Sequence, residues 1–429
     1  MEPARVCQRS GHIVRGRSTS DDQYSHPGIS GPHCAPRAKE IDVALMTGGI
    51  DKPYVHGLAT GLAAKGIRMD VIGSDDLDSE AMRSTSGLRF ISLLQTKERR
   101  GLVAKVVRVF GNYGRLLKYA ATAKPRVFHI LWNYKIQALD RTFVILFYRI
   151  LGKKVVLTAH NVNAGKRDNN DCLFNRLTLH IQYRLVHKIF VHTQKMALEL
   201  QRDFRVPNSS IVLIPFGINN AAPRTELTRD EARRRLGIGV ADKTLLFFGA
   251  IRPYKGLEYL VDAFLQLVAE CQEYRLVIAG SPHTASQEYF RQIERRIDGS
   301  SAQSRIIQVI RYIPDDDVEL YFKAADISIL PYTDIYQSGV LLLAYSFGLP
   351  VLAANVGSIQ DDVVEGYTGF LCTPRDSEDL ARKVRLYFGS ELYQSLAERR
   401  QSIISYAAES HSWEVVADTT SLVYGQLLN

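Results

Sequence analysis

Arg252 and Lys255 lie in a short loop between a predicted strand and a predicted helix, within the stretch FFGAIRPYKGLEYLVDAF that begins at Phe247. The strand ends at Gly249 and the helix begins near Gly256. Backbone N–H groups at a helix start carry partial positive charge, and with two cations beside them they form a binding site for a diphosphate. A solvated basic turn is the alternative that this stretch alone leaves open.

A histidine and a pair of glycines follow two other predicted strands. His160 comes after KVVLTA and stands in a polar loop, where a histidine is a candidate hydrogen-bonding or acid–base group. Gly48 and Gly49 follow the strand IDVALM, and their lack of a side chain allows the backbone to approach a ligand closely. The spacing matches neither a GxGxxG fingerprint nor a GK(S/T) phosphate loop, so neither a nicotinamide enzyme nor an ATPase is predicted. His129, inside a strand, is predicted to be a core residue.

A polar cluster opens the otherwise apolar stretch PYTDIYQSGVLLLAYSFGLPVLA, residues 331–353. The cluster precedes a predicted helix, whose first N–H groups and one amide side chain can hydrogen-bond the neutral hydroxyls of a sugar. The helix is interpreted as core, and the cluster is either a wall of a ligand pocket or only the turn of a well-packed βαβ unit. The candidate binding residues of the cluster are Tyr332, Asp334, Gln337, Ser338 and Gly339.

Carboxylates gather in two further places. Asp361, Asp362 and Glu365 lie near a strand end, where they are candidates to accept hydrogen bonds from ribose or sugar hydroxyls, or to be a solvated helix start. The run 315–317 is all aspartate and follows Pro314, as a helix start would. Because adjacent carboxylates at such a position are commonly solvated, no metal site is expected.

Composition limits the class of protein. The 429 residues carry a net charge of +9, which suits an anionic partner such as a nucleotide or a phospholipid. No nucleic-acid-binding motif is visible and aromatic residues do not interleave with the basic run, so no nucleic-acid partner is expected. The five cysteines are far apart and form no CxxC pair, which favours a reducing cytosol over a disulfide framework. No secretory signal is visible.

Two segments bear on membranes. Residues 97–124 hold eight Lys or Arg against one acidic residue, together with an apolar stripe, so they can lie on an anionic membrane surface or pack on their own sheet. The most apolar run, FVILFYRIL at residues 143–151, is about half the length of a membrane-spanning helix. We interpret this run as a buried amphipathic helix.

The elements that must position these residues repeat in a simple order. Apolar strands alternate with helices, which predicts an α/β fold with parallel sheets covered on both faces. The pattern pauses at 219–224 and restarts. We expect a disordered tail at 1–40, a Rossmann-like domain at 41–220, a second at 221–405 and a C-terminal helix at 406–429 that packs back on the first domain. Ligands of such doubly wound domains bind at the carboxyl ends of strands, here in a cleft between the two.

With these residues in hand, the chain resembles a retaining glycosyltransferase of family 4 (group 1), with the GT-B fold. The resemblance covers about residues 41–429. It is carried by FFGAIRPYKGLEYLVDAF, LYFKAADISILPY, GLPVLAANVGSIQDDVVEGYTGFLC and the helix around Trp413, in the order and at the spacings of that family. It implies a nucleotide-diphosphate sugar held mainly by the second domain and an acceptor held mainly by the first. No cofactor or metal is expected.

The resemblance also assigns roles. Lys255 matches the lysine that holds the donor phosphates, His160 the histidine that points at the donor sugar, and Gly48-Gly49 the loop beside the transferring phosphate. The family arginine is replaced by Ala250, and Arg252 is the candidate substitute.

Two glutamates eight positions apart, which contact the sugar and the ribose in the family, are replaced by Ile335 and Leu343.

We therefore expect transfer of a sugar to a hydroxyl of a saccharide or lipid-linked acceptor, in bacterial polysaccharide synthesis, in the cytosol and at the inner face of the membrane. The catalytic residues are predicted to be His160, Arg252 and Lys255, and the donor site to add Gly48, Gly49, Gly249 and the polar cluster at 332–339. The alternative is a non-catalytic relative that binds a sugar nucleotide or a partner enzyme, which the loss of both glutamates favours.

Overall fold

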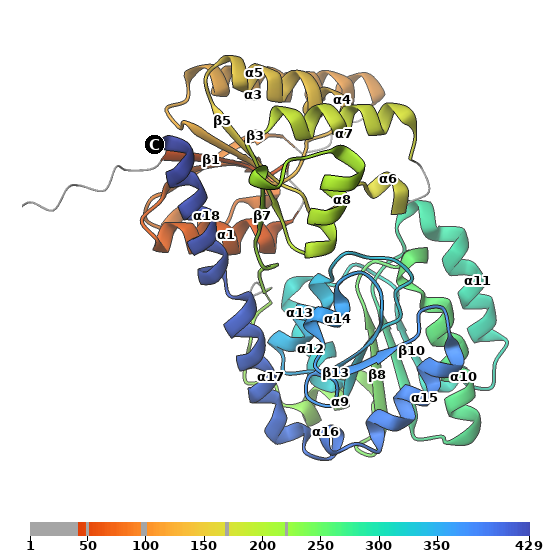
Figure 1. Ribbon diagram of the computed structural model, residues 1–429. Helices are drawn as coiled ribbons and strands as arrows, with labels where there is room; N and C mark the ends of the chain where they lie inside the picture. The colour runs from red at the N-terminus through yellow and green to blue at the C-terminus, as the bar shows by residue number, and fades with distance from the viewer. Residues whose placement is uncertain (1–41, 49–50, 96–100, 168–170, 219–221) are drawn as a thin grey trace, which may run out of the picture. The chain divides into compact units, whose positions relative to one another are not determined.

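The computed structural model describes residues 42–48, 51–95, 101–167, 171–218 and 222–429. The expected tail at 1–40, Gly49 and the first half of the predicted hinge at 219–224 lie outside these ranges. The described chain forms two parallel sheets joined by helices, which confirms the expected pair of Rossmann-like α/β domains (Figure 1).

The first sheet has seven strands in the order β3-β2-β1-β4-β5-β6-β7, and all neighbouring pairs are parallel. Strands β2, β4 and β5 are buried along nearly their whole length, which explains why the sequence shows continuous apolar runs rather than alternation. The strands are β1 (Asp42–Met46), β2 (Arg68–Ser74), β3 (Leu88–Leu94), β4 (Val127–Ile130), β5 (Lys154–Thr158), β6 (Lys188–Val191) and β7 (Ile211–Leu213).

Helices cover both faces of this sheet (Figure 1). One face packs against α3 (Leu102–Thr122), α5 (Ile145–Ile150), α7 (Leu173–Leu185) and α8 (Gln194–Phe204), whose buried residues form one apolar cluster with the strands. The other face packs against α1 (Lys52–Ala64) and α18 (Trp413–Leu428). Shorter elements are α2 (Glu80–Ser84), α4 (Gln137–Leu139), the π-helical turn η2 (Asp140–Val144) and α6 (Ala164–Arg167).

The second sheet has six parallel strands in the order β10-β9-β8-β11-β12-β13. Its strands are β8 (Lys243–Phe248), β9 (Tyr274–Ala279), β10 (Ile306–Val309), β11 (Ile327–Leu330), β12 (Val351–Ala354) and β13 (Gly369–Cys372). Its helices are α9 (Arg229–Leu236), α10 (Leu257–Glu270), α11 (Gln287–Asp298), α12 (Asp315–Ala324), α13 (Gly339–Ser346), α14 (Ile359–Asp362), α15 (Ser377–Phe388), α16 (Glu391–Gln394) and α17 (Leu396–His411). As predicted, the aspartate run at 315–317 begins a helix.

The helix α18 packs directly on α1 (Figure 1). Glycine on α1 makes this close approach possible, because a Cβ at Gly57 would lie 1.9 Å from Cε2 of Trp413. The indole Nε1 of Trp413 donates to the Ile218 carbonyl at 2.8 Å. The buried Tyr424 hydroxyl lies 2.6 Å from Nδ1 of His129, which is itself fully buried, as the sequence predicted.

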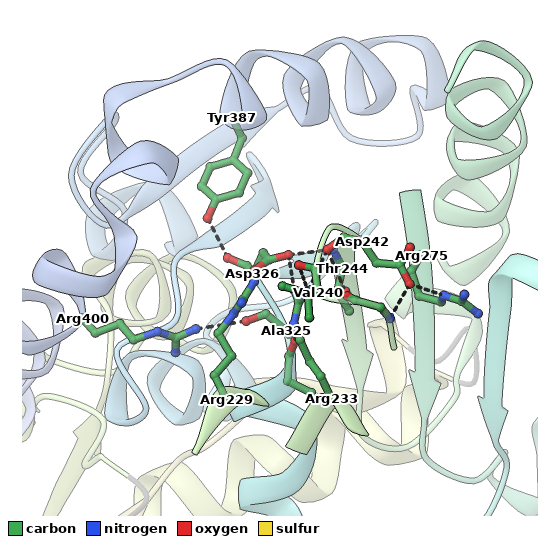
Figure 2. Close-up of polar contacts among 12 residues, drawn as sticks. Arg229, Arg233, Val240, Asp242, Thr244, Arg275, Ala325, Asp326, Tyr387 and Arg400 are labelled. Carbon is green, nitrogen blue, oxygen red and sulfur yellow. Dashed lines mark hydrogen bonds and ion pairs between the residues drawn. The ribbon is translucent and has the colours of Figure 1, made fainter. Parts of the chain in front are cut away.

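A buried ion pair joins three elements of the second half (Figure 2). Arg233 on α9 and Asp326 at the start of β11 are almost inaccessible to solvent, and Nη2 and Oδ2 lie 2.7 Å apart. The Arg233 guanidinium also donates to the carbonyls of Ala324 and Asp242, and the Thr244 N–H donates to Asp326 Oδ2 at 2.8 Å. The hydrogen-bonding capacity of this pair is therefore largely used within the fold, which identifies it as structural.

One prediction changes in the structure. Residues 143–151 form the end of η2 and α5, but Phe143 and Ile150 are exposed to solvent, so the segment is helical and not wholly buried. The expected boundary at 405/406 lies within α17, and the division of the chain into domains at 220/221 and 405/406 stays a proposal. Among the described residues, no helix contains an apolar stretch long enough to cross a bilayer.

Candidate active site

Each sheet reverses its strand order at one point, and the predicted site residues follow the strands there. In the first sheet the reversal lies between β1 and β4, which lead to Gly48 and Trp132. In the second it lies between β8 and β11, which lead to Gly249 and Tyr332. Because helices on either side of such a point diverge, it is where doubly wound sheets bind ligands.

Lys255 ends a 3-10 turn, Pro253–Lys255, between β8 and α10. Its Nζ lies beside the Gly249 backbone, 3.0 Å from where a Cβ on Gly249 would be, and 5.7 Å from the centroid of the Tyr332 ring. The side chain is 7% exposed. Burial, followed by the positive charge of Arg252, lowers the pKa of Lys255 to about 8. A desolvated cation without a counter-ion among the described residues is prepared to receive an anion.

A cavity of about 420 Å³ contains Lys255 and draws its walls from both halves of the chain. From the carboxyl edge of the first sheet come His160 and Trp132, and from the second come Lys255 and the polar cluster. The lining residues are Asp51, Pro53, Tyr54, Trp132, His160, Asn161, Arg167, Phe216, Gly217, Tyr254, Lys255, Tyr332, Ile335, Gln337, Ser338, Gly339, Val340, Leu343 and Trp413.

The neighbouring His192 determines which ring nitrogen of His160 donates a hydrogen bond and which accepts one. His192 Nδ1 lies 3.4 Å from the Ile214 carbonyl, which can only accept, so this nitrogen carries the proton. Burial lowers the pKa of His192 to about 4, so His192 is neutral and its Nε2 is an acceptor. His160 Nδ1, 3.2 Å away, must then donate to it.

The other ring nitrogen of His160, Nε2, is left as an acceptor. It is buried and has no hydrogen-bond partner among the described residues. Burial also holds the pKa of His160 well below its usual value. The ring stacks on Trp132 with centroids 4.1 Å apart, which fixes its plane. His160 therefore presents a neutral acceptor, suited to a hydroxyl group.

The polar cluster is held in place by its own side chains. Ser338 caps α13 by accepting from the Leu341 N–H at 3.3 Å, and its Oγ lies 3.3 Å from the Tyr332 hydroxyl. The Thr333 N–H donates to the Tyr254 carbonyl at 2.8 Å, which ties the cluster to the Lys255 turn. Tyr332 and Ser338 thus line the cavity with hydroxyls already engaged in the fold.

Gln337 differs from these neighbours. Its Nε2 donates to Asp362 Oδ2 at 3.3 Å, but its Oε1 is buried and has no partner among the described residues. Ile335 and Leu343, at the positions of the two family glutamates, also line the cavity. The walls there are apolar, and Gln337 is the polar side chain that remains beside them.

The remaining predicted residues lie around the cavity rather than in its wall. Gly249 and Arg252 are next to Lys255 but do not line it. Asp334 is exposed and also outside the lining. Gly48 has a φ of +61° and lines a smaller, mainly apolar cavity in the first half. Gly49 lies outside the described residues.

Two charged residues of the lining were not predicted from the sequence. Arg167, from α6, lies over the Tyr254 ring with 4.6 Å between its Cζ and the ring centroid, and its Nη1 donates to Asn161 Oδ1 at 3.3 Å. Asp51 is the one carboxylate among the described residues of the lining, and its Oδ1 accepts from the Tyr54 N–H at 3.1 Å. Burial raises the pKa of Asp51. Neither residue belongs to a motif, so only the fold reveals them.

Within the described ranges, no group of three or more His, Cys, Asp or Glu residues is arranged to hold a metal ion.

Comparison with known families agrees with this geometry. Residues 228–410 match the family described as glycosyl transferases group 1, and residues 52–221 match glycosyltransferase family 4. The chain belongs to the group 1 glycosyltransferases of family 4. The family noted in the sequence is thereby confirmed, while retention at the transferred carbon stays a prediction.

Curated relatives of this glycosyltransferase are D-inositol 3-phosphate glycosyltransferases. The protein from Geodermatophilus obscurus is 31% identical over 203 residues, which cover 46% of this chain and 43% of the relative. The protein from Streptomyces avermitilis is 28% identical over 247 residues, or 51% of its length. The protein from Corynebacterium diphtheriae is 23% identical over 397 residues, covering 87% and 88%. The chain thus spans about half the length of the first two relatives.

Solved structures establish the GT-B fold. Anabaena HepE in complex with UDP and glucose has a TM-score of 0.70 at 15% identity, covering 90% of this chain and all of that one. Sucrose-phosphate synthase from Thermosynechococcus elongatus has a TM-score of 0.70 at 20% identity, covering 91% and 99%. The starch synthase IV catalytic domain from Arabidopsis thaliana, bound to ADP and acarbose, has a TM-score of 0.67 at 14% identity, covering 91% and 100%.

Proposed function

We propose that this glycosyltransferase moves a hexose from a nucleotide-diphosphate sugar to a hydroxyl of a saccharide or lipid-linked acceptor, with retention at the transferred carbon. The observation that carries the proposal is the cavity in which Lys255 and His160 face a common space from the carboxyl edges of two different sheets. The UDP in one solved relative and the ADP in another fit a site of this charge.

Each residue of the site would have its own role in the reaction. The departing nucleotide diphosphate gains negative charge, which Lys255, Arg252 and the N–H groups after Gly249 stabilise. His160 Nε2 accepts a hydrogen bond from a sugar hydroxyl, and so does Gln337 Oε1. The one carboxylate in the described lining, Asp51, is engaged in capping α1, which leaves no evident side-chain nucleophile there. Departure and attack on the same face of the sugar is therefore the proposed course, without a metal ion.

Polysaccharide synthesis in the bacterial cytosol, at the inner face of the membrane, is the setting that we propose. Its support is the basic segment 97–124, whose described part, α3, contains Lys and Arg and no acidic residue. An anionic lipid surface would hold such a segment beside a lipid-linked acceptor.

A second candidate is a non-catalytic protein that binds a sugar nucleotide or a partner enzyme. The apolar Ile335 and Leu343 in the cavity wall favour it, because no carboxylate replaces the glutamates expected there. Lys255 and His160 would then serve binding alone.

Thermal stabilisation by a panel of nucleotides and sugar nucleotides, followed by turnover assays with the binders, tests both candidates. A ligand that binds only the folded state raises its stability by mass action. We expect one uridine, guanosine or adenosine diphosphate sugar to stabilise the wild type and not Lys255→Ala. The matched control is Lys243→Ala, at the start of β8, which is the strand that leads to the Lys255 turn. This variant should respond as the wild type. Stabilisation without transfer or donor hydrolysis would support a non-catalytic protein that binds a sugar nucleotide. No stabilisation by any nucleotide would contradict the transferase and would leave the non-catalytic protein that binds a partner enzyme.

A further inference from the structure

The outward side of α3 is apolar over its first two turns. Val103, Val106, Val107 and Phe110 recur at the spacing of one helix face, and they are 77%, 46%, 65% and 59% exposed. The residues that pack on the sheet, such as Leu116, lie further along the helix. This apolar stripe therefore faces away from the core, although helix faces of this composition are normally buried.

The neighbouring helices continue this surface. Phe143 of η2 is 70% exposed, and Leu173 and Phe174 at the start of α7 are 86% and 64% exposed. Arg141 in η2 donates to Asn175 Oδ1 of α7 at 2.8 Å, so these two elements are adjacent. The α3 helix joins them through the segment before α4, because the Ile136 N–H donates to the Tyr113 hydroxyl at 2.9 Å. We call the exposed sides of α3, η2–α5 and α7 the three-helix face.

The charge of the three-helix face has one sign. Asp140 is the sole acidic residue in these helices, and it is buried. The exposed charged residues there are cations, among them Lys105, Lys118 and Arg184. Asp171, just before α7, is already ion-paired with Arg176, with Nε and Oδ2 2.6 Å apart. An acid-free surface that combines exposed aliphatic and aromatic side chains with cations complements anionic lipid headgroups over acyl chains.

We propose that the three-helix face docks on an anionic membrane surface, with the apolar side chains of α3, η2 and α7 inserted among the lipids. In a parallel sheet, a helix that connects two strands starts at the carboxyl edge. Val103, Phe143 and Leu173 stand near the starts of their helices, so the inserted part lies toward the edge that carries His160. A lipid-borne acceptor would thus reach the site directly. This inference extends the proposed membrane contact of 97–124 to two helices outside that segment.

Vesicle sedimentation of the full chain, without donor or acceptor, tests this proposal. The vesicles are phosphatidylcholine alone or mixed with phosphatidylglycerol. We expect binding to the anionic vesicles that survives partly at high salt, because apolar insertion is not screened. The double variant Leu173→Ser/Phe174→Ser should bind about tenfold or more weakly, because two large apolar groups no longer leave water. Its control, Val240→Ser/Tyr312→Ser, removes two equally exposed apolar side chains from the second half and should bind as the wild type.

Three results would overturn the proposal. They are no binding of the wild type to anionic vesicles, equal binding of the α7 variant, or light scattering that shows a wild-type dimer which the α7 variant converts to a monomer. The last result would make the face a contact between two copies of the chain. Nucleotide stabilisation, measured on the same samples, reports separately on the proposed transferase site. Its loss with intact vesicle binding would contradict that site alone.

Discussion

Lys255 is a cation in surroundings that disfavour its charge. Its burial lowers its pKa to about 8, so the free protein loses this cation as the pH rises through that value. A bound diphosphate favours the charged form and raises the pKa again. Ligand affinity and proton affinity at this amine are therefore linked.

The linkage predicts how nucleotide binding depends on pH. Below about pH 8 the amine is charged and affinity should be constant, and above it affinity should fall by up to about tenfold per pH unit. Titration calorimetry with the diphosphate that stabilises the protein measures this profile. Lys255→Arg keeps its charge throughout and should show no such fall. An identical decline in both proteins would assign the titration to another group.

Gln337 also has a buried polar atom, Oε1, that forms no hydrogen bond among the described residues. Gln337→Met preserves size but removes the carbonyl oxygen that has no partner. We expect kcat/KM to fall about tenfold to a hundredfold, which corresponds to the loss of about 1.4 to 2.7 kcal/mol of hydrogen bonding to the sugar. Gln272→Met, whose amide bonds the Val268 carbonyl far along α10, is the control. Unchanged kcat/KM in Gln337→Met would remove Gln337 from the site.

At the scale of elements, the second sheet depends on a buried charged side chain, Arg233, whose burial the sequence does not indicate. Arg233 reads as one of three consecutive arginines on a polar helix, yet its guanidinium is buried and joins α9 to the start of β11 and to the turn before β8 (Figure 2). Removing one member of such a pair leaves a desolvated charge and several carbonyls without donors.

Arg233→Met should therefore lower the free energy of unfolding by about 3 kcal/mol or more. Denaturant unfolding followed by circular dichroism measures the change. Arg235→Met, on the same helix but in an exposed pair with Glu231, should change it by less than about 1 kcal/mol. Equal effects of the two substitutions would refute the assignment.

The elements themselves were largely predictable. The strands expected from IDVALM, from KVVLTA and before Gly249 are present as β1, β5 and β8, because parallel strands buried on both faces leave a continuous apolar signature. The exposure of Phe143 and Ile150 was not predictable, since apolar side chains surround this short helix and periodicity cannot tell which of them faces the sheet. Of the predicted site residues, His160, Lys255 and Gln337 line the cavity, and the sequence indicated each of them because it lies in a loop between a strand and a helix. Their roles stay predictions.

At the scale of the whole molecule, the cavity combines residues that no local pattern relates. Arg167 ends α6, the helix that follows β5, and its cation–π contact is with Tyr254, which neighbours Lys255. Sequence reasoning chose Arg252 as the second cation because of its spacing from Lys255. Whether two residues of different halves lie close together depends on how the chain folds, and the spacing of residues in the sequence does not reveal it.

The fold therefore predicts that loss of Arg167 lowers the activity more than loss of Arg252. Arg167→Ala should lower kcat/KM for a sugar-nucleotide donor by about tenfold to a hundredfold, as expected for loss of one cation beside a developing anion. Lys166→Ala, the exposed neighbour, should leave it unchanged. Steady-state kinetics on these and Arg252→Ala give the ranking. A larger loss in Arg252→Ala than in Arg167→Ala would favour the sequence-based choice.

The packing of α18 on α1 has a consequence for biosynthesis. The ribosome makes the seven strands of the first sheet early, but Trp413, Val416 and Tyr424, which cover one face of that sheet, are made after the entire second sheet. Until then Leu58 and Leu62 of α1 lack part of their apolar cover. A nascent chain stalled before α18 would expose this surface to chaperones, and the half that is translated first would be the last to complete its fold.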